Sequence, residues 1–165
     1  MVIWIIGKSG VGKTFLAKKI YYKIKKIFKK VIWVDGDKFR RKFSRDLGFS
    51  IKERRKNSLR IQKYCKYHEK KKYVVICSIL SIFREHQKKN RKFFNKYFQI
   101  YVKASDAKLI KRNKKKIYDK KLNVVGKDIK FPIPYNSDLV IFNNFKSKFL
   151  KNVKKIENKI YDQIQ

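Results

Sequence analysis

The chain has few of the residues that build redox or zinc sites. It holds two cysteines and two histidines in 165 residues. Cys65 and Cys77 form no C-x-x-C pair, and with only His68 and His86 for company they make a poor metal site. We therefore expect both thiols to be reduced, with Cys77 a small core residue in an apolar strand.

Long apolar runs are also missing. No stretch approaches the roughly 20 apolar residues that cross a bilayer. Met1 leads directly into a strand pattern, which leaves no room for a signal peptide. We therefore expect a cytoplasmic protein without membrane contact. The hydrophobic content of 43% is enough for a core, and the length predicts one domain over 1–165.

Acidic residues are scarce, since 12 Asp+Glu stand against 47 Lys+Arg and the formal net charge is +35. Such a charge is typical of proteins that bind nucleic acid or anionic surfaces. It is also typical of chains whose solvated faces carry surplus lysine. The basic residues are spread along the whole chain, which favours the second interpretation. Either way, we expect non-specific binding of polyanions at low salt.

The most informative stretch is residues 2–14. The apolar run 2–6 predicts a buried strand, and 7–14 satisfies G-x-x-x-x-G-K-[ST] in full before an apolar-periodic helix begins. Strand, glycine loop and helix stand in the order of a phosphate-binding loop. The residues that we expect to bind the phosphates are Gly7, Lys8, Ser9, Gly10, Val11, Gly12, Lys13 and Thr14.

Each residue type in this loop has a physical reason. Glycines let the backbone turn and approach an anion closely, so that successive N–H groups and a helix N-terminus face the phosphates. Lys13 reaches the outer phosphates as a point charge, and the Thr14 hydroxyl is a ligand for Mg²⁺. Binding of ATP or GTP with Mg²⁺ is therefore predicted.

The rest of the chain alternates short strands with helices. The predicted strands are 31–34, 73–78, 98–102 and 138–141, and the predicted helices are 14–28, 51–68, 84–96 and 105–112, with a closing helix through Phe149, Val153, Ile156 and Ile160. The capping box Ser50–Glu53 marks the start of the second helix. This alternation predicts an α/β fold of the P-loop NTPase type, with a mostly parallel five-stranded sheet and helices on both faces. Residues 113–136 show no clear period and predict a functional lid.

Asp35-Gly36-Asp37 follows the second strand, at the sheet edge where α/β proteins bind ligands. With this segment, the chain resembles the adenylylsulfate kinase family. Residues 34–40 resemble its DGDxxR segment, and 46–60 match its DLGFS…R..N..R run without a gap. Weaker matches are 81–84 to SPxR, with Ile82 in place of proline, 112–118 to RDxKGLY, and 138–141 to the last strand. The likeness covers about residues 2–144, and its most specific part is 35–60.

The resemblance implies a function and a set of roles. The family uses MgATP to phosphorylate the 3′-hydroxyl of adenosine 5′-phosphosulfate. By this resemblance Asp37 is the base or orienting group, Lys13 and Ser81 complete the catalytic set, and Asp35 joins Thr14 at Mg²⁺. The implied substrate contacts are Asp37, Arg40, Phe49, Arg54, Asn57, Leu80, Ser81 and Lys115. Guanidinium groups suit the phosphosulfate, and Phe49 suits the base. A homodimer is implied by the same analogy.

The chain departs from the family pattern in and near the predicted lid. Asn113 replaces an aspartate, Lys116 replaces a glycine, and the lid is shorter than usual. Where the family typically has Phe-Thr-Gly, with its Phe over the adenine, this chain has 123–126, Asn-Val-Val-Gly. One lost aromatic face removes roughly 1–3 kcal/mol of stacking.

Three alternatives to adenylylsulfate phosphorylation therefore stay open. The first is a kinase of the same fold that acts on another nucleotide-linked substrate, such as a cytidine diphosphate derivative in surface-polysaccharide synthesis. The second is a nucleotide-dependent nucleic-acid-binding protein. The third is a decayed kinase that binds ATP without turnover.

Overall fold

The computed structural model describes residues 1–112, 122–145, 149, 156 and 158–161. In this part of the chain the strands are β1 (Val2–Ile6), β2 (Val31–Asp35), β3 (Val74–Ile79), β4 (Tyr97–Lys103) and β5 (Leu139–Phe142). They form one sheet in the order β2-β3-β1-β4-β5, and every pairing is parallel. The predicted five-stranded parallel sheet is thus confirmed, and the carboxyl ends of its strands share one edge.

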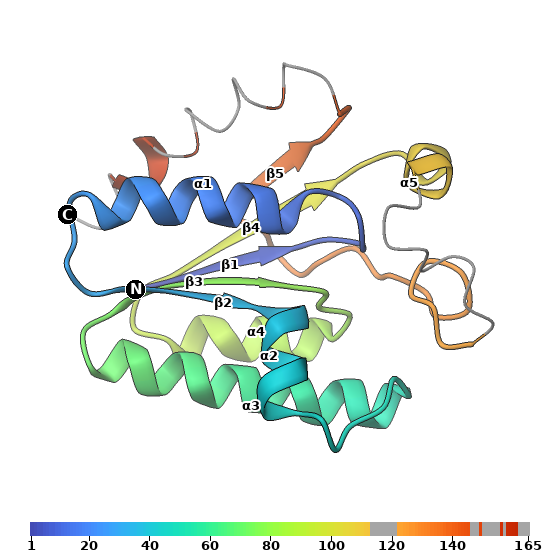
Figure 1. Ribbon diagram of the computed structural model, residues 1–165, viewed down its shortest axis with the longest axis horizontal. Helices are drawn as coiled ribbons and strands as arrows, with labels where there is room; N and C mark the ends of the chain where they lie inside the picture. Colours follow the sequence, from blue (N-terminus) through green and yellow to red (C-terminus); the bar gives the residue numbers. More distant parts are fainter. Residues whose placement is uncertain (113–121, 146–148, 150–155, 157, 162–165) are drawn as a thin grey trace.

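The helices of the described part are α1 (Lys13–Lys25), α2 (Gly36–Phe43), α3 (Ile51–Lys70), α4 (Arg84–Phe93) and α5 (Asp106–Arg112). Figure 1 shows α1 on one face of the sheet, α3 and α4 on the other, and α2 beyond the end of β2. Alternate residues of β1 enter the two cores: Ile3 and Ile5 pack with α1, whereas Trp4 packs with α3. Burial on both faces explains why the central strands are apolar throughout.

The start of α3 is where the capping box predicted it. The Ser50 hydroxyl accepts a hydrogen bond from the Glu53 N–H at 3.3 Å, and the Glu53 carboxylate accepts from the Ser50 N–H at 3.1 Å. The helix α2 was not predicted, because Asp35-Gly36-Asp37 resembles a turn and a basic run follows it. The Asp35 carboxylate caps α2 by accepting from the N–H groups of Asp37 and Lys38, at 3.2 and 3.1 Å. This cap continues the strand into a helix.

Some predictions fall on the undescribed part of the chain. Val153, the predicted contact Lys115 and the rest of 113–121 lie outside the described residues. The described positions of the predicted closing helix are helical, and Phe149, Ile156 and Ile160 are buried against the core that contains α1. Residues 122–136 of the predicted lid contain a single bridge, Val125–Ile129, and neither a helix nor a strand.

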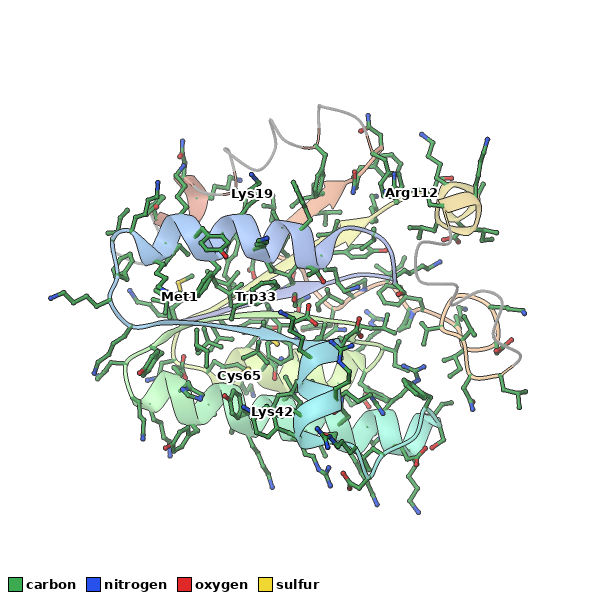
Figure 2. All side chains as sticks on the ribbon, viewed as in Figure 1. Met1, Lys19, Trp33, Lys42, Cys65 and Arg112 are labelled. Atoms are coloured by element: carbon green, nitrogen blue, oxygen red, sulfur yellow. The ribbon has the colours of Figure 1, made fainter. Side chains whose placement is uncertain are left out.

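The positive charge is spread over the molecule. Figure 2 shows nitrogen-tipped side chains around the whole outline. Most carboxylates in the described ranges are held by a neighbouring cation, in the pairs Asp46–Arg60, Glu69–Lys66, Glu85–Arg55, Asp106–Lys8 and Asp138–Arg91. None of the described helices is long and apolar enough to cross a membrane.

Candidate active site

The loop between β1 and α1 presents its backbone at a helix N-terminus. Gly10 and Gly12 have φ values of 78° and 103°, which side chains rarely adopt, and Gly12 is the residue before α1. A Cβ at Gly12 would lie 2.9 Å from Nδ2 of Asn143. The Lys13 ammonium donates to the Lys8 carbonyl at 2.8 Å, and the Lys8 ammonium pairs with Asp106 at 2.6 Å. The loop is therefore closely surrounded and suited to cradle an anion.

A hydroxyl and a carboxylate meet beside this loop. Thr14 Oγ1 donates to Asp35 Oδ2 at 2.9 Å, and Ser78 Oγ donates to the same oxygen at 3.3 Å. These oxygens come from α1, β2 and β3, and oxygen ligands of this kind are those that Mg²⁺ prefers. No group of three or more His, Cys, Asp or Glu side chains gathers for a metal within the described ranges. A magnesium ion at Thr14 and Asp35 would thus take its other ligands from phosphate and water.

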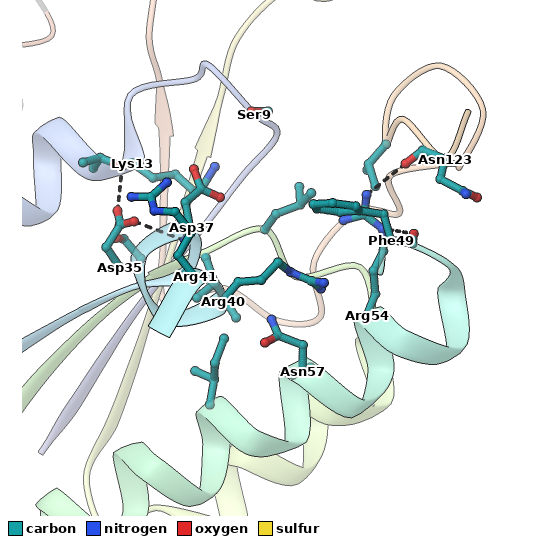
Figure 3. Close-up of a pocket in the computed structure, with 18 of the residues that line it drawn as sticks. Ser9, Lys13, Asp35, Asp37, Arg40, Arg41, Phe49, Arg54, Asn57 and Asn123 are labelled. Carbon is teal, nitrogen blue, oxygen red and sulfur yellow. Dashed lines mark hydrogen bonds between the residues drawn. The ribbon is translucent and has the colours of Figure 1, made fainter. Parts of the chain in front are cut away.

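A cavity of about 380 Å³ opens from this point along the sheet edge (Figure 3). At its polar end are residues of the β1–α1 loop, α1, β2, α2 and β3: Ser9, Lys13, Thr14, Asp35, Gly36, Asp37, Arg41 and Ser78. Towards its other end are Arg40, Phe49, residues of α3, residues 79–80 and residues 122–125: Arg40, Phe49, Arg54, Asn57, Ser58, Ile61, Ile79, Leu80, Leu122, Asn123, Val124 and Val125. This size and this mixture of apolar wall and few polar groups are typical of a small-molecule site.

Two of the three arginines build the cavity wall. Arg40 Nη1 donates to the carbonyls of Leu47, at 3.1 Å, and Gly48. Arg54 donates through Nε to the Phe49 carbonyl at 2.8 Å and through Nη2 to the Asn123 carbonyl at 2.9 Å. Both guanidinium carbons lie over the Phe49 ring, at 4.7 Å for Arg40 and 5.4 Å for Arg54.

The charge of Arg54 is not neutralised within the described part of the chain. Its hydrogen bonds to described residues go to neutral carbonyls, and burial, followed by repulsion from Arg40, lowers the pKa of its guanidinium. Burial also lowers the pKa of Arg40, against the attraction of Glu53. Two crowded cations that face a cavity favour the binding of an anion there.

Asn57 and Phe49 present groups that a ligand can use. Oδ1 of Asn57 is buried without a hydrogen-bond partner among the described residues. The side chain of Phe49 is 51% exposed although it lines the cavity. An amide oxygen without a partner among the described residues and a half-exposed aromatic ring suit a planar ligand with hydrogen-bond donors.

The far wall comes from a segment distant in sequence. Val124 and Val125 are buried at 3% and 4% exposure and line the cavity. The Val124 N–H donates to Asp128 Oδ2 at 2.8 Å, which holds the segment in a compact turn. Because Arg54 of α3 donates a hydrogen bond to the Asn123 carbonyl, α3 and the far wall are joined across the cavity.

Most of the predicted site residues lie around this one cavity. Those that line it are Ser9, Lys13, Thr14, Asp35, Asp37, Arg40, Phe49, Arg54, Asn57 and Leu80. Ser81 does not line it: this residue is 2% exposed, and its hydroxyl accepts from Gln87 Nε2 at 3.2 Å. Adjacent residues of an extended segment face opposite ways, so Leu80 reaches the cavity and Ser81 does not. The placement thus gives no support to a catalytic role for Ser81.

Sequence reasoning missed Arg41, Ser58 and Ile61, which also line the cavity. The signal for Arg41 is its place four residues after Asp37, which puts both on one helix face. That spacing was uninformative as long as α2 was not predicted. Ser58 and Ile61 follow Asn57 by one and four residues on α3, where the sequence alone did not tell the inner face.

Comparison with known proteins adds a family to this geometry. The family model described as adenylylsulphate kinase matches residues 1–142. A cytidine diphosphoramidate kinase of Campylobacter jejuni is 33% identical, over 96% of this chain and 95% of its own. A probable adenylyl-sulfate kinase of Archaeoglobus fulgidus is 32% identical, over 85% and 94%. The APS kinase of Mycobacterium tuberculosis in complex with AMPPNP and APS is 22% identical, with a TM-score of 0.83 over 99% of this chain and 96% of its own.

Proposed function

Because this chain belongs to the adenylylsulphate kinase family, we propose that it transfers the γ-phosphoryl group of ATP to a ribose hydroxyl of a nucleotide with an anionic 5′ group. The observation that carries this proposal is one cavity that joins the phosphate-binding loop and Asp37 to Arg40, Arg54, Asn57 and Phe49. One end suits a triphosphate, and the other suits a flat base and an anion.

The residues at the polar end support the transfer itself. Phosphoryl transfer mostly needs positioning and neutralisation of charge. In this proposal Asp37 orients the acceptor hydroxyl and takes its proton, while Lys13 and the loop amides hold the phosphates. Thr14 and Asp35 would hold Mg²⁺, which would supply neutralisation of the phosphate charge.

For the acceptor we propose a cytidine diphosphate derivative, such as cytidine diphosphoramidate. The far wall next to the base end is aliphatic, Val124 and Val125, and Phe49 is the cavity's aromatic ring within the described residues. One stacking face contributes roughly 1–3 kcal/mol of binding free energy. A small pyrimidine loses less of this energy than a purine does when one of two aromatic walls is replaced by aliphatic side chains. The relative named cytidine diphosphoramidate kinase spans nearly the whole chain, which supports the same acceptor.

Adenosine 5′-phosphosulfate is the second candidate acceptor. The arginine and asparagine contacts expected for it, Arg40, Arg54 and Asn57, all line the cavity. The chain also matches a probable adenylyl-sulfate kinase over 94% of that protein. Both acceptors would be phosphorylated by the same fold and the same mechanism. The two molecules differ only in the base and in the terminal group of the 5′ anion.

A product assay tests the proposal. Purified protein with MgATP is offered cytidine diphosphoramidate, adenosine 5′-phosphosulfate, and cytidine and adenosine without a 5′ anion, and products are identified by phosphorus NMR and mass. We expect a 3′-phosphorylated cytidine product and no turnover of the plain nucleosides. Asp37→Asn should abolish turnover, whereas Asp46→Asn, which removes a surface carboxylate paired with Arg60, should not. Turnover of adenosine phosphosulfate alone selects the second acceptor, and no turnover of any nucleotide refutes the kinase.

A further inference from the structure

Arg41 differs from the other two arginines of the cavity in having an uncommitted guanidinium. Arg40 and Arg54 each donate to two backbone carbonyls. Arg41 takes part in a hydrogen bond through its backbone, whose carbonyl accepts from Arg45 Nε at 2.6 Å. Its guanidinium makes no hydrogen bond or ion pair with any residue of the described ranges. It nevertheless lines the cavity.

The helix places Arg41 at the reacting end. Asp37 and Arg41 are four residues apart in α2, so their side chains project from one face. Figure 3 shows Arg41 reaching to the side of the cavity where Asp37 and Lys13 lie, while Arg40 points along the cavity towards Asn57. The cap from Asp35 fixes the first turn of this helix and therefore the direction of the face.

We propose that Arg41 is a catalytic residue that binds the transferred γ-phosphoryl group. This inference rests on the proposed function, because it presumes a phosphoryl group in transfer. An oxygen of the ribose hydroxyl donates a lone pair to Pγ, and its proton passes to Asp37. The bond from Pγ to the bridging oxygen breaks, and its electron pair stays on ADP. Negative charge spreads over the three equatorial oxygens of Pγ, and a planar guanidinium matches two of them at once.

The alternative is a structural role, since Arg41 is a cation in the last turn of α2, where it favours the helix dipole. Lys42 gives the matched control. It follows Arg41 in the same turn, carries the same charge, lies over the Phe43 ring at 5.2 Å and does not line the cavity. A dipole effect would be common to both residues, whereas contact with the phosphoryl group belongs to Arg41.

The experiment compares the intact wild-type protein with Arg41→Ala, Arg41→Lys and Lys42→Ala. With the acceptor found above, we expect Arg41→Ala to lower kcat by about 10²- to 10³-fold, with the KM of the acceptor nearly unchanged. Arg41→Lys should recover part of kcat, and Lys42→Ala should match the wild type. Equilibrium binding gives a second readout: Arg41→Ala should weaken AMPPNP and leave ADP unchanged, because only AMPPNP has a γ-phosphoryl group.

Each outcome decides one statement. If the wild type turns over no nucleotide, the proposed function fails, and the AMPPNP–ADP comparison still tests Arg41 because it needs no acceptor. If Arg41→Ala and Lys42→Ala behave alike in both readouts, or if Arg41→Ala weakens ADP as much as AMPPNP, the catalytic role is refuted.

Discussion

Replacement of Arg54 by alanine tests the anion-binding end of the cavity. The guanidinium is partly buried, donates to two carbonyls at 2.8 and 2.9 Å, and has no carboxylate partner in the described part of the chain. A nucleotide with an anionic 5′ group supplies the missing charge. A hydrogen bond to a charged group contributes about 1.5–3 kcal/mol, and 1.4 kcal/mol is a tenfold change in affinity. The expected rise in the KM of the acceptor is therefore about 10- to 150-fold.

The assay is initial rates with each substrate varied at saturating levels of the other. The KM of ATP should stay within about twofold of the wild-type value, because Arg54 lies at the end of the cavity proposed for the acceptor and not at the phosphate-binding loop. Arg55→Ala is the control, since Arg55 is the neighbouring cation, pairs with Glu85 and does not line the cavity. An equal rise in both KM values, or the same rise in Arg55→Ala, would refute the assignment of Arg54 to the acceptor site.

Three further predictions concern the loop, the two histidines and the surface charge. Gly12→Ala should weaken AMPPNP at least about tenfold and lower the Tm, because φ is 103° and the new Cβ would lie 2.9 Å from Asn143; calorimetry and nucleotide titration measure both. Burial lowers the pKa of His86 and of His68 below the ordinary 6.5, so the unfolded chain takes up protons first and the free energy of unfolding should fall as the pH drops below 6.5. Urea unfolding followed by fluorescence tests this, and a constant midpoint between about pH 7 and 5 would contradict it. Single-stranded DNA should bind at low salt because of the +35 charge and lose about 10³-fold or more in affinity between 50 and 200 mM salt; an affinity by fluorescence anisotropy that does not change with salt would contradict this prediction.

Much of the fold follows from local chemistry that the sequence displays. The apolar strands, the glycine loop and the capping box at Ser50 each depend on a few neighbouring residues, and each was predictable. The helix α2 was missed because its cap, Asp35, has the same residue type as a turn aspartate. Only its contact with the following N–H groups distinguishes the two.

The sequence predicted which residues form the site, but not which hydrogen bonds their side chains make. The resemblance to the adenylylsulfate kinase family grouped Arg40, Arg54, Asn57 and Phe49 as substrate contacts, and the four residues do line one cavity. Which arginine is bound to carbonyls and which is uncommitted depends on the path of the chain through 44–50 and 122–125. Ser81 shows the opposite case, since the resemblance predicts that it lines the pocket, whereas the residue is buried and hydrogen-bonded to Gln87.

The two oxygens of Asp35 serve two different parts of the molecule. One accepts from Thr14 and Ser78, and the other holds the first turn of the helix that carries Asp37 and Arg41. A cation that bound this carboxylate would therefore also strengthen or weaken the hydrogen bonds that cap α2. Binding of the ion and the positions of Asp37 and Arg41 would then be thermodynamically linked. A substitution of Asp35 would therefore remove both the proposed metal ligand and the cap of α2, so that a loss of activity in such a variant would not separate the two effects. Thr14 contacts Asp35 Oδ2 but takes no part in the cap of α2. A substitution of Thr14 would therefore test the metal site without removing the helix cap.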